Sequence, residues 1–477
     1  MTITVEAEFG NRENWTFENL IKSAYEMAME VGRDFVVKAL ESRDRELMEE
    51  RDRRRYRCKG KQKTSIKTKL GVIECSRNVY VDESVTEGIK CVHLLDEDLQ
   101  IEKIGLIAKE VCETAAELAC ESSFRASARA ITETTGLSIS AQGVWNIVQA
   151  YGEQRLEQIE RHAELARQNS GVGCVVSKIL YEENDGVWLK LQGKDRKKHG
   201  PSKEMKVGIA YDGATWQVGK GGKKRRTLDC KVAHASFESA NMFREHKEGV
   251  VASRFDVDEI ELRIINGDGA NWIQKKDNTD CICVLDRFHR NKKLTECIRD
   301  TDFLKTAQNL LFENRIDDLL TCIAAQIDST EDEAEQEGLR ELRGYYTENK
   351  DAMLSPYERG IDIPETREPG VIHHARLGSM ESNIFTLIGN RMKDRRCNWS
   401  IRGGNHLAAL LCLKHTAGLD VLSQPIPVLQ NTANPFSASK APRTAGSGSE
   451  CYSRASLPNL PWLKAITEWR SFTDFSL

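Results

Sequence analysis

Apolar residues recur along this chain with two different spacings, and each spacing predicts a different kind of element. Between residues 14 and 55 they recur at helical intervals, which predicts one long helix. From residue 63 to residue 81 apolar and polar side chains alternate on both sides of Gly71, as they do in a β-hairpin. The first part of the chain is therefore predicted to be a helix followed by a hairpin at about residues 56–82.

The pattern after the hairpin is that of two helices joined by a short turn. One helix is expected to end shortly before Gly136, and a second opens near Ser140, with Ser138 or Ser140 as its N-cap. At about residues 123–151 this arrangement matches a helix-turn-helix, whose second helix can enter the major groove of DNA. A simple corner between two packed helices has the same pattern, so both interpretations stay open. The groove-facing side chains would be Gln142 and Asn146.

The middle of the chain is rich in β-strand patterns. Three runs, at residues 174–193, 203–218 and 224–236, are separated by turns rich in Gly, Lys and Arg, which predicts an antiparallel meander. A helix and two further buried strands follow, and these strands end at Asp268 and Asp286. This order of elements is typical of an α/β domain with a mixed sheet.

Composition divides the chain into four parts. A helical, charged segment without strand candidates interrupts the sheet domain and is predicted to be an insertion, and the C-terminal part is rich in Pro, Ser and Gly, as flexible tails are. The predicted parts are a mainly helical N-terminal DNA-binding region at residues 1–170, the mixed-sheet domain at residues 171–290 with 371–420, the helical insertion at residues 291–370 and the tail at residues 421–477.

Three carboxylates are distinguished by their positions at or near the ends of predicted elements. Asp185 lies in the first strand of the β-rich part, Asp268 ends the fourth, and Glu381 opens a late helix. If the first and fourth strands are neighbours, the aspartates lie side by side and the helix can bring the glutamate to them. Converging carboxylates repel one another unless divalent cations neutralise them, and oxygen ligands suit Mg²⁺ or Mn²⁺. The residues that compete for the first position are Glu182, Glu183 and Asp212.

Two such ions can activate a water or a 3′-hydroxyl beside a phosphodiester and stabilise the leaving oxygen. Gly267 and Gly269 are expected either to leave room for a phosphate backbone or to flank a tight Asx turn after the strand. Asp286 and His289 form a D-x-x-H, in which the histidine is either a hydrogen-bond donor to the phosphate or a satisfied core residue. Drawn as an α-helix, the late helix has Glu381 inside its apolar stripe, where a carboxylate is costly unless it is paired.

Charge is unevenly distributed along the chain. The net charge is −4, yet residues 51–69 hold ten Lys or Arg residues against one acid, and residues 220–226 read KGGKKRR. Such patches suit a polyanion such as nucleic acid, although solvated surface runs have the same composition. The expected phosphate contacts are Lys67, Lys69 and Arg77 in the hairpin, Lys223, Lys224 and Arg225 in the second patch, and Arg391 and Arg395 after the late helix begins.

The overall composition argues against a membrane or secreted protein. The hydrophobic fraction is 40%, with no run of about 18 apolar residues and no signal pattern at the N-terminus, so a cytoplasmic protein is expected. The 14 cysteines include no CxxC pair, which predicts reduced thiols and no structural zinc held by cysteine pairs.

Four segments together resemble a known family. They are NDGVWLKLQG, INGDGANWI, LDRFHR and MESNIFTLIGNRMKDRRCNWSIRGGNHLAALL. From the N-terminal helix to about residue 419 the sequence is similar to the ISLre2 family of bacterial insertion-sequence transposases, also described as the UPF0236 family. The D-x-x-H is similar to one in Mutator-type relatives, which also carry a helical insertion before the glutamate.

This resemblance implies a DDE transposase with an RNase H-like catalytic domain. Asp185, Asp268 and Glu381 would then bind two Mg²⁺ or Mn²⁺ ions, with His289 beside them. The implied partners are double-stranded DNA, as terminal inverted repeats and target, and further copies of the chain in a nucleoid-associated synaptic complex. Two alternatives remain: a non-catalytic, domesticated or decayed sequence-specific DNA-binding protein, and a metal-dependent DNA nuclease.

Overall fold

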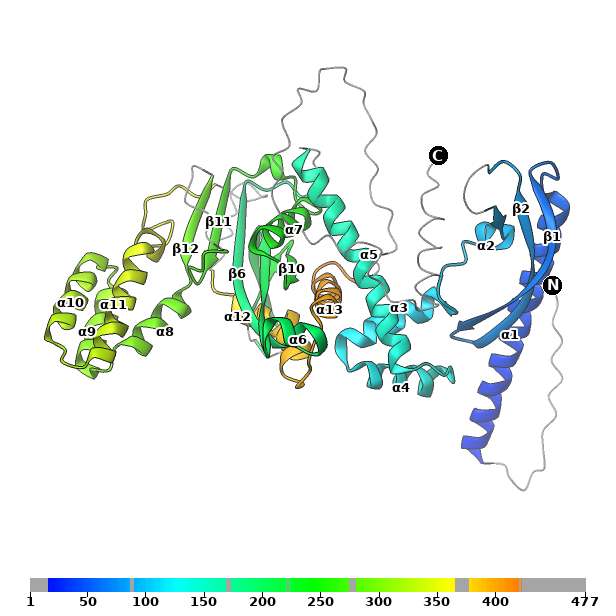
Figure 1. The fold of residues 1–477 in the computed structure, drawn as a ribbon, viewed down its shortest axis with the longest axis horizontal. Helices are drawn as coiled ribbons and strands as arrows, with labels where there is room; N and C mark the ends of the chain where they lie inside the picture. The colour runs from blue at the N-terminus through cyan, green and yellow to red at the C-terminus, as the bar shows by residue number, and fades with distance from the viewer. Residues whose placement is uncertain are drawn as a thin grey trace, which may run out of the picture. The chain divides into compact units, whose positions relative to one another are not determined.

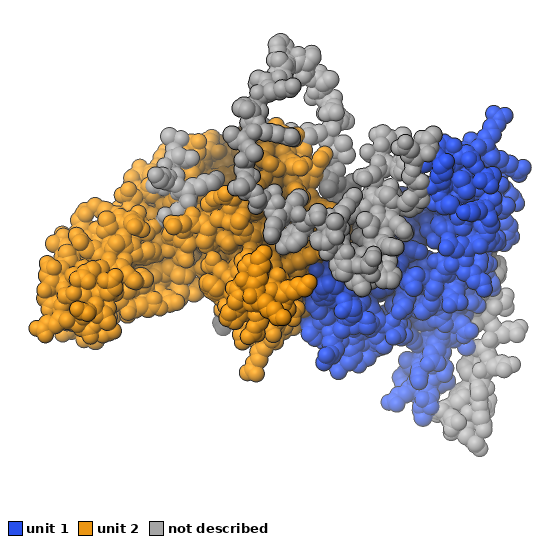
Figure 2. Space-filling model, in the orientation of Figure 1, with its two compact units in different colours: residues 1–150, 430–477 blue, residues 151–429 orange. Residues whose placement is uncertain are grey.

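The computed structural model describes residues 16–85, 90–168, 173–219, 221–222, 224–273, 280–364, 377–419 and 422. The chain divides into two compact units between Ala150 and Tyr151 (Figure 2). The boundary lies inside a helix, whereas the sequence predicted it near residue 170. The helix is Ala141–Arg167, and its second half packs tightly within the second unit. A Cβ on Gly249 would lie only 2.7 Å from the backbone nitrogen of Ala163.

Helices hold most of the described residues of the first unit, and the predicted hairpin is extended into a five-stranded sheet by three short strands. The long predicted helix and the hairpin are both present, and the hairpin forms the centre of the sheet, whose order is β3-β2-β1-β5-β4. The strands are β1 (Tyr56–Thr68), β2 (Gly71–Asp82), β3 (Cys91–Val92), β4 (Lys103–Ile104) and β5 (Ile107–Ala108). The helices are α1 (Phe17–Glu50), α2 (Leu94–Asp98), α3 (Lys109–Glu121), α4 (Phe124–Thr135) and α5 (Ala141–Arg167), the last of which continues into the second unit (Figure 1).

The turn between α4 and α5 has the predicted chemistry. Gly136 ends α4 in a left-handed conformation, which glycine adopts without the steric cost of a Cβ. Ser140 accepts a hydrogen bond at 3.0 Å from the backbone N–H of Gly143, so of the two predicted N-caps it is Ser140 that caps α5.

A second five-stranded sheet forms the centre of the second unit (Figure 1). Its order is β10-β7-β6-β11-β12, with β7 antiparallel to both of its neighbours and β11 and β12 parallel to β6. The first and fourth strands of the predicted domain are therefore neighbours. The strands are β6 (Ile179–Lys190), β7 (Ser202–Tyr211), β10 (Val232–Ser236), β11 (Leu262–Gly267) and β12 (Cys281–Leu285).

The predicted three-run meander differs from the observed strands. Its second and third runs each break into two strands, and the inner halves, β8 (Gly213–Val218) and β9 (Lys224–Asp229), form a separate two-stranded sheet. This hairpin lies between β7 and β10 in the sequence and carries the second basic patch.

Helices pack on the sheet and at its edge. One face is covered by α7 (Ala240–Ala252) and the second half of α5, through a core that includes Leu180, Val250 and Phe255. The short α6 (Gly193–His199) follows β6, and the late segment forms α12 (Met380–Ile384), the π-helix η4 (Phe385–Lys393) and α13 (Ile401–Lys414). No helix in the described ranges is both long and apolar enough to cross a membrane.

The segment predicted to be a helical insertion is formed by helices and short connections up to residue 353 and has turns and irregular structure from 354 to 364. It has its own core, which includes Leu319, Leu342 and Tyr346, and it gathers beyond β12 at the edge of the sheet (Figure 1). Its elements are α8 (Arg287–Cys297), α9 (Thr301–Phe312), α10 (Ile316–Ser329), α11 (Glu333–Glu348) and the 3-10 turn Asp351–Met353. Of the predicted tail at residues 421–477, all but Leu422 lies outside the described residues.

Candidate active site at the ends of three parallel strands

Two aspartates from neighbouring parallel strands form the centre of the site. β6 and β11 pair with Glu183 opposite Asn266, so Asp185 and Asp268 each follow two residues further along their own strands. β11 ends at Gly267 whereas β6 continues to Lys190, so the parallel register places Asp268, just after β11, beside Asp185 in the middle of β6. The sequence prediction required this adjacency.

The electrostatics of Asp185 are those of a crowded carboxylate. Burial raises its pKa from 3.8 to about 6, the charges of Asp268 and Asp286 act in the same direction, and His289 opposes them. Its Oδ1 accepts a hydrogen bond at 2.7 Å from the backbone N–H of Gly186. Its Oδ2 lies 3.8 Å from Nε2 of His289. Asp185 is therefore held in place but only partly compensated.

Asp286 and His289 extend the cluster from the third parallel strand. Asp286 caps α8 by accepting from the backbone N–H groups of Phe288 and His289, at 2.9 and 3.1 Å. Although burial opposes it, hydrogen bonds from His289 and Asn266 lower the pKa of Asp286 to about 2. Hydrogen bonding to Asp286 and the charge of Asp185 raise the pKa of His289. The imidazole thus lies between two carboxylates, at the sheet edge where the D-x-x-H pattern was expected to bring it.

The turn after β11 ties the site to the helical insertion. Asp268 accepts a hydrogen bond at 2.9 Å from the backbone N–H of Ala270 in an Asx turn. Its backbone carbonyl accepts a hydrogen bond at 2.7 Å from the hydroxyl of Tyr345 on α11. Burial, and after it the charges of Asp268 and Asp286, raise the pKa of Tyr345, so the phenol stays protonated and can donate.

The glycines on either side of Asp268 do not leave space for a phosphate backbone, so this prediction is wrong. A Cβ on Gly267 would lie 2.6 Å from Cγ2 of Ile273. A Cβ on Gly269, where φ is +85°, would lie 3.1 Å from Oδ1 of Asn349 and 3.3 Å from Cε2 of Tyr345. The protein's own side chains occupy the space, and the glycines allow the turn to pack against them.

Glu183 has a structural role that the sequence did not reveal. Its carboxylate is fully buried and accepts hydrogen bonds from the hydroxyl of Tyr211 at 2.6 Å and from Nδ2 of Asn266 at 3.2 Å. The backbone N–H groups of Gly378 and Ser379 donate to it at 2.8 and 2.9 Å. Glu183 therefore fixes the start of α12 against β6, two residues from Asp185 on the same face.

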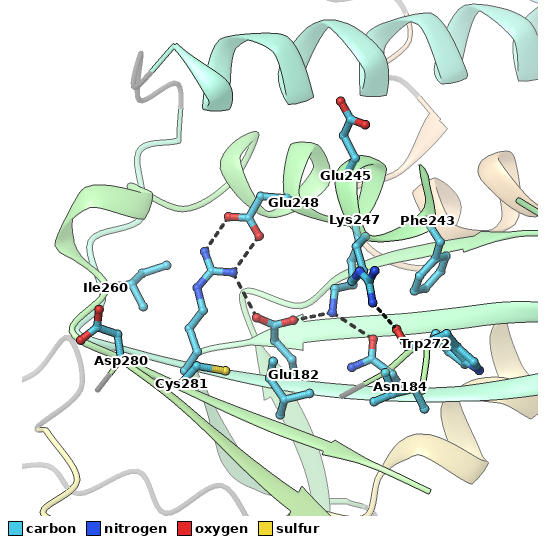
Figure 3. A pocket seen from close by; sticks show the side chains of 14 residues that line it. Glu182, Asn184, Phe243, Glu245, Lys247, Glu248, Ile260, Trp272, Asp280 and Cys281 are labelled. Carbon is cyan, nitrogen blue, oxygen red and sulfur yellow. Dashed lines mark hydrogen bonds and ion pairs between the residues drawn. The ribbon is translucent and has the colours of Figure 1, made fainter. Parts of the chain in front are cut away.

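Glu182 points to the opposite face of β6, where it forms ion pairs with Lys247 and Arg263. These residues line a pocket of about 480 Å³ beneath α7, in which the basic groups contact carboxylates of the protein itself (Figure 3). Asp212 follows Tyr211, which pairs with Tyr181 rather than with a residue near Asp185. Neither Glu182 nor Asp212 therefore shares the position of Asp185 beside Asp268.

Glu381 is the second residue of α12 and follows closely after Gly378 and Ser379, which donate to Glu183. Its side chain is exposed, so the prediction that it lies within the buried stripe is wrong. The buried side of the segment is formed by Met380, Leu387, Ile388 and Met392, and the change to a π-helix alters the angles on which the α-helical projection relied. Among the described residues, the Glu381 carboxylate has no hydrogen bond or ion pair, which leaves it available to a ligand.

Two of the predicted phosphate contacts are buried, and these predictions are wrong. Arg77 is 7% exposed and forms an ion pair with Asp96. Arg391 is 4% exposed, with its guanidinium 5.4 Å from the ring centre of Trp399. Both cations already have partners inside the protein and are not available to a DNA backbone.

The remaining predicted contacts lie on the surface or outside the described structure. Lys69 and Arg395 are exposed, and Nζ of Lys67 donates to the carbonyl of Ser138 at 2.9 Å. Gln142 donates to Asn146 at 2.8 Å near the start of α5. Lys223 and the side chains of Lys224 and Arg225 lie outside the described residues.

The fold and this site define an α/β protein with a mixed sheet and a cluster of three aspartates and one histidine at the ends of parallel strands. The chain belongs to the uncharacterised protein family UPF0236, whose model matches residues 11–421. It is similar to a UPF0236 protein in the vanSb 3′ region of Streptococcus gallolyticus, with 22% identity over 344 residues that cover 70% of each chain.

Replacing Asp185 by asparagine is expected to stabilise the protein at pH 7 in the absence of divalent cations. Because the folded pKa of about 6 lies above the ordinary 3.8, the contribution of Asp185 to stability is greatest below about pH 4 and is lost as the pH rises through 6. The asparagine variant has no charge to bury, so its free energy of unfolding at pH 7 should exceed that of wild type by about 1–3 kcal/mol. Urea unfolding at pH 7 and pH 4 measures the difference, which should shrink at the lower pH. A variant less stable than wild type at pH 7 would contradict the electrostatics of the cluster.

Proposed function

We propose that this protein is a DNA transposase with an RNase H-like catalytic domain of the DDE type. The observation that carries the proposal is the pair of aspartates, Asp185 and Asp268, on adjacent central strands of a sheet ordered β10-β7-β6-β11-β12. In that sheet β7 alone runs against the other strands, which is the strand arrangement of RNase H-like domains. The bonds from Gly378 and Ser379 to Glu183 hold the start of α12 against β6, which supports Glu381 of α12 as the third carboxylate.

The residues fit divalent cations. Burial, and to a smaller extent the charges of Asp268 and Asp286, raise the pKa of Asp185 in the absence of cations, and Glu381 has no internal partner among the described residues. All three ligands offer carboxylate oxygens, which Mg²⁺ and Mn²⁺ prefer. When bound, two such ions would supply Lewis-acid activation of the attacking and leaving oxygens. Asp185, Asp268 and Glu381 would hold them.

His289 has a separate part in this proposal. Asp286 fixes its Nδ1 side at 3.2 Å, so Nε2 is directed to the region of Asp185. The raised pKa keeps a proton on the ring at neutral pH more often than in a free imidazole. His289 would therefore donate a hydrogen bond from Nε2 to a phosphate oxygen or to the leaving oxygen.

DNA binding is proposed for surfaces of the first unit. The hairpin around Lys67 and Lys69 would contact the phosphate backbone, and Gln142 and Asn146 would face base edges from α5. Since Gln142 and Asn146 are hydrogen bonded to each other, reading bases would require this bond to be exchanged for bonds to DNA. Joining two DNA ends requires more than one copy of the chain, so we propose a homo-oligomer on DNA.

An end-cleavage assay tests the proposed function. The full chain is incubated with Mg²⁺ or Mn²⁺ and a DNA fragment that carries the sequences flanking its gene, and nicking and joining are followed on a denaturing gel. We expect cleavage at the ends and transfer of 3′-hydroxyls to a target, both abolished by a chelator. Cleavage without end specificity or joining would favour a nuclease, and end binding without strand breaks would favour a non-catalytic DNA-binding protein. Either result would overturn the proposal.

A further inference from the structure

A buried histidine without a hydrogen-bond partner lies on the α7 face of the sheet. His234 on β10 is 1% exposed, and neither of its ring nitrogens has a hydrogen-bond partner among the described residues. The nearest acid is Glu238, with Oε2 at 3.9 Å from Nε2 of His234, which is too long for a hydrogen bond. Buried polar groups are normally satisfied, so this imidazole calls for a partner that the protein chain does not supply.

Two further metal-binding groups converge on the same point. Nδ1 of His246 lies 3.0 Å from Oε2 of Glu238. One ligand atom from each of His234, Glu238 and His246 lies within 4.8 Å of the others. Ligand atoms about 2.0–2.2 Å from a tetrahedral ion lie about 3.3–3.6 Å apart, so a shift of about 1 Å in these side chains would bring all three into range.

The three residues are positioned by rigid elements. His234 pairs with Gly208 of β7, and a Cβ on Gly208 would lie 3.2 Å from Phe243, so only a glycine leaves room for α7 to approach at this point. Phe243 and His246, spaced by three residues on α7, are both buried toward the sheet. These contacts place His234 and His246 with ring centres 5.8 Å apart.

Glu238 is held by further polar contacts. The hydroxyl of Ser236 donates to its Oε2 at 3.0 Å, and Nζ of Lys206 donates to its backbone carbonyl at 2.8 Å. Hydrogen bonds of this kind orient the ligands of metal sites and fix which lone pairs are available.

We propose that His234, Glu238 and His246 bind a zinc ion. Two imidazoles and one carboxylate are ligands that Zn²⁺ binds well and that Mg²⁺ does not select, since Mg²⁺ prefers oxygen ligands. This ligand set contains no cysteine, unlike the structural zinc sites held by cysteine pairs. Three protein ligands leave a fourth position for water.

The zinc site is separate from the acidic cluster. Even-numbered residues of β6 face α7, since Glu182 and Asn184 both contact Lys247, and His234 lies on that face because it pairs with Gly208, which pairs with Asn184. The odd-numbered Asp185 points to the other face, so the two sites lie on opposite faces of the sheet. The ion would tie the edge strand β10 to α7 without contacting DNA or the acidic cluster. Zinc binding at this site therefore does not depend on whether the protein cuts DNA.

The alternative is an ion pair between a protonated His246 and Glu238 with no metal. The charged groups that face His246 are Glu238, Glu160 of α5 and Glu245 of its own helix, and all three favour protonation. This pair would satisfy His246 and Glu238 but would leave His234 without a partner. A metal ion satisfies all three, which is why we favour it.

Zinc titration of the full chain tests the proposal. Protein stripped with a chelator is titrated with Zn²⁺ alone, bound metal is counted by elemental analysis, and Co²⁺ is used as a visible probe of coordination geometry. We expect one tight zinc ion per chain and a rise in Tm on binding. In Glu238→Gln and His246→Gln proteins, affinity should fall by more than about 100-fold, the upper end of the loss caused by removing an outer-shell partner.

Two matched controls separate this site from others. His199→Gln removes an exposed histidine outside the cluster, and Asp268→Asn alters the acidic cluster, so both should bind zinc as wild type does. If His246→Gln does not fold, Glu238→Gln still tests the site, because Glu238 is only partly buried. Wild-type protein that takes up no zinc, or cluster variants that bind it as tightly as wild type, would overturn the proposal.

Discussion

An Asp268→Ala protein is expected to cut DNA at least about 10³-fold more slowly than wild type while binding DNA ends with nearly unchanged affinity. Asp268 lies beside Asp185 at the ends of paired strands, and its loss would remove one of the carboxylates proposed to hold the ions. Metal ions supply several kcal/mol of charge stabilisation in the transition state, and each 1.4 kcal/mol is tenfold in rate. DNA binding is proposed to depend on surfaces of the other unit, which the change does not touch.

The measurements for this prediction are single-turnover cleavage with Mg²⁺ and a mobility-shift assay at fixed salt, since affinity for DNA depends strongly on salt. Asp280→Ala is the matched control, because Asp280 is an exposed aspartate just before the start of β12, at the opposite end of the strand from Asp286. This control should cleave normally. If Asp268→Ala cleaves at the control's rate, the proposed site is wrong.

Replacing Glu183 by alanine is expected to cost about 3–5 kcal/mol of folding free energy. The change would leave the buried hydroxyl of Tyr211 and one N–H of the buried Asn266 amide without an acceptor, and would also release the less buried backbone N–H groups of Gly378 and Ser379. Each unsatisfied buried donor costs about 1–3 kcal/mol, and partial relaxation lowers their sum. Urea unfolding measures the loss.

Glu183→Gln is the matched control, because it keeps the shape and one acceptor oxygen while removing the charge. It should lose less stability than the alanine variant, since at least some donors keep a partner. Release of α12 should also appear as faster hydrogen exchange at Gly378 and Ser379 in the alanine variant. Unfolding midpoints equal to wild type in both variants would show that this carboxylate does not anchor α12.

The local features of the fold could be predicted from the sequence because they depend on neighbouring residues. Alternation around Gly71 predicted the β1-β2 hairpin, and Ser140 was one of two predicted caps of α5. The apolar runs placed Asp185 in the first strand and Asp268 at the end of the fourth, which gave both as candidates. Their adjacency required only that β6 and β11 be neighbours, a property of the sheet order rather than of either strand.

The features that could not be predicted depend on contacts between distant segments. Nothing near Arg77 or Arg391 in the sequence indicates that Asp96 and the ring of Trp399 are their partners. Glu183 looks like any acid in a strand until Gly378 and Ser379 are brought to it from far along the chain. A π-helix bonds residue i to i+5 and so has a wider turn than an α-helix, and an α-helical projection therefore misplaced the side chains after Glu381.

The hydrogen bond from Tyr345 to the Asp268 carbonyl limits how this protein can be re-engineered or can diverge. An insertion attached only through its two ends could be deleted or exchanged as a cassette. Here the inserted helices supply one wall of the turn that carries Asp268, and Asn349 fills the space above Gly269. A shortened chain without these helices would need new side chains to support that turn, so the insertion and the turn are expected to change together rather than separately.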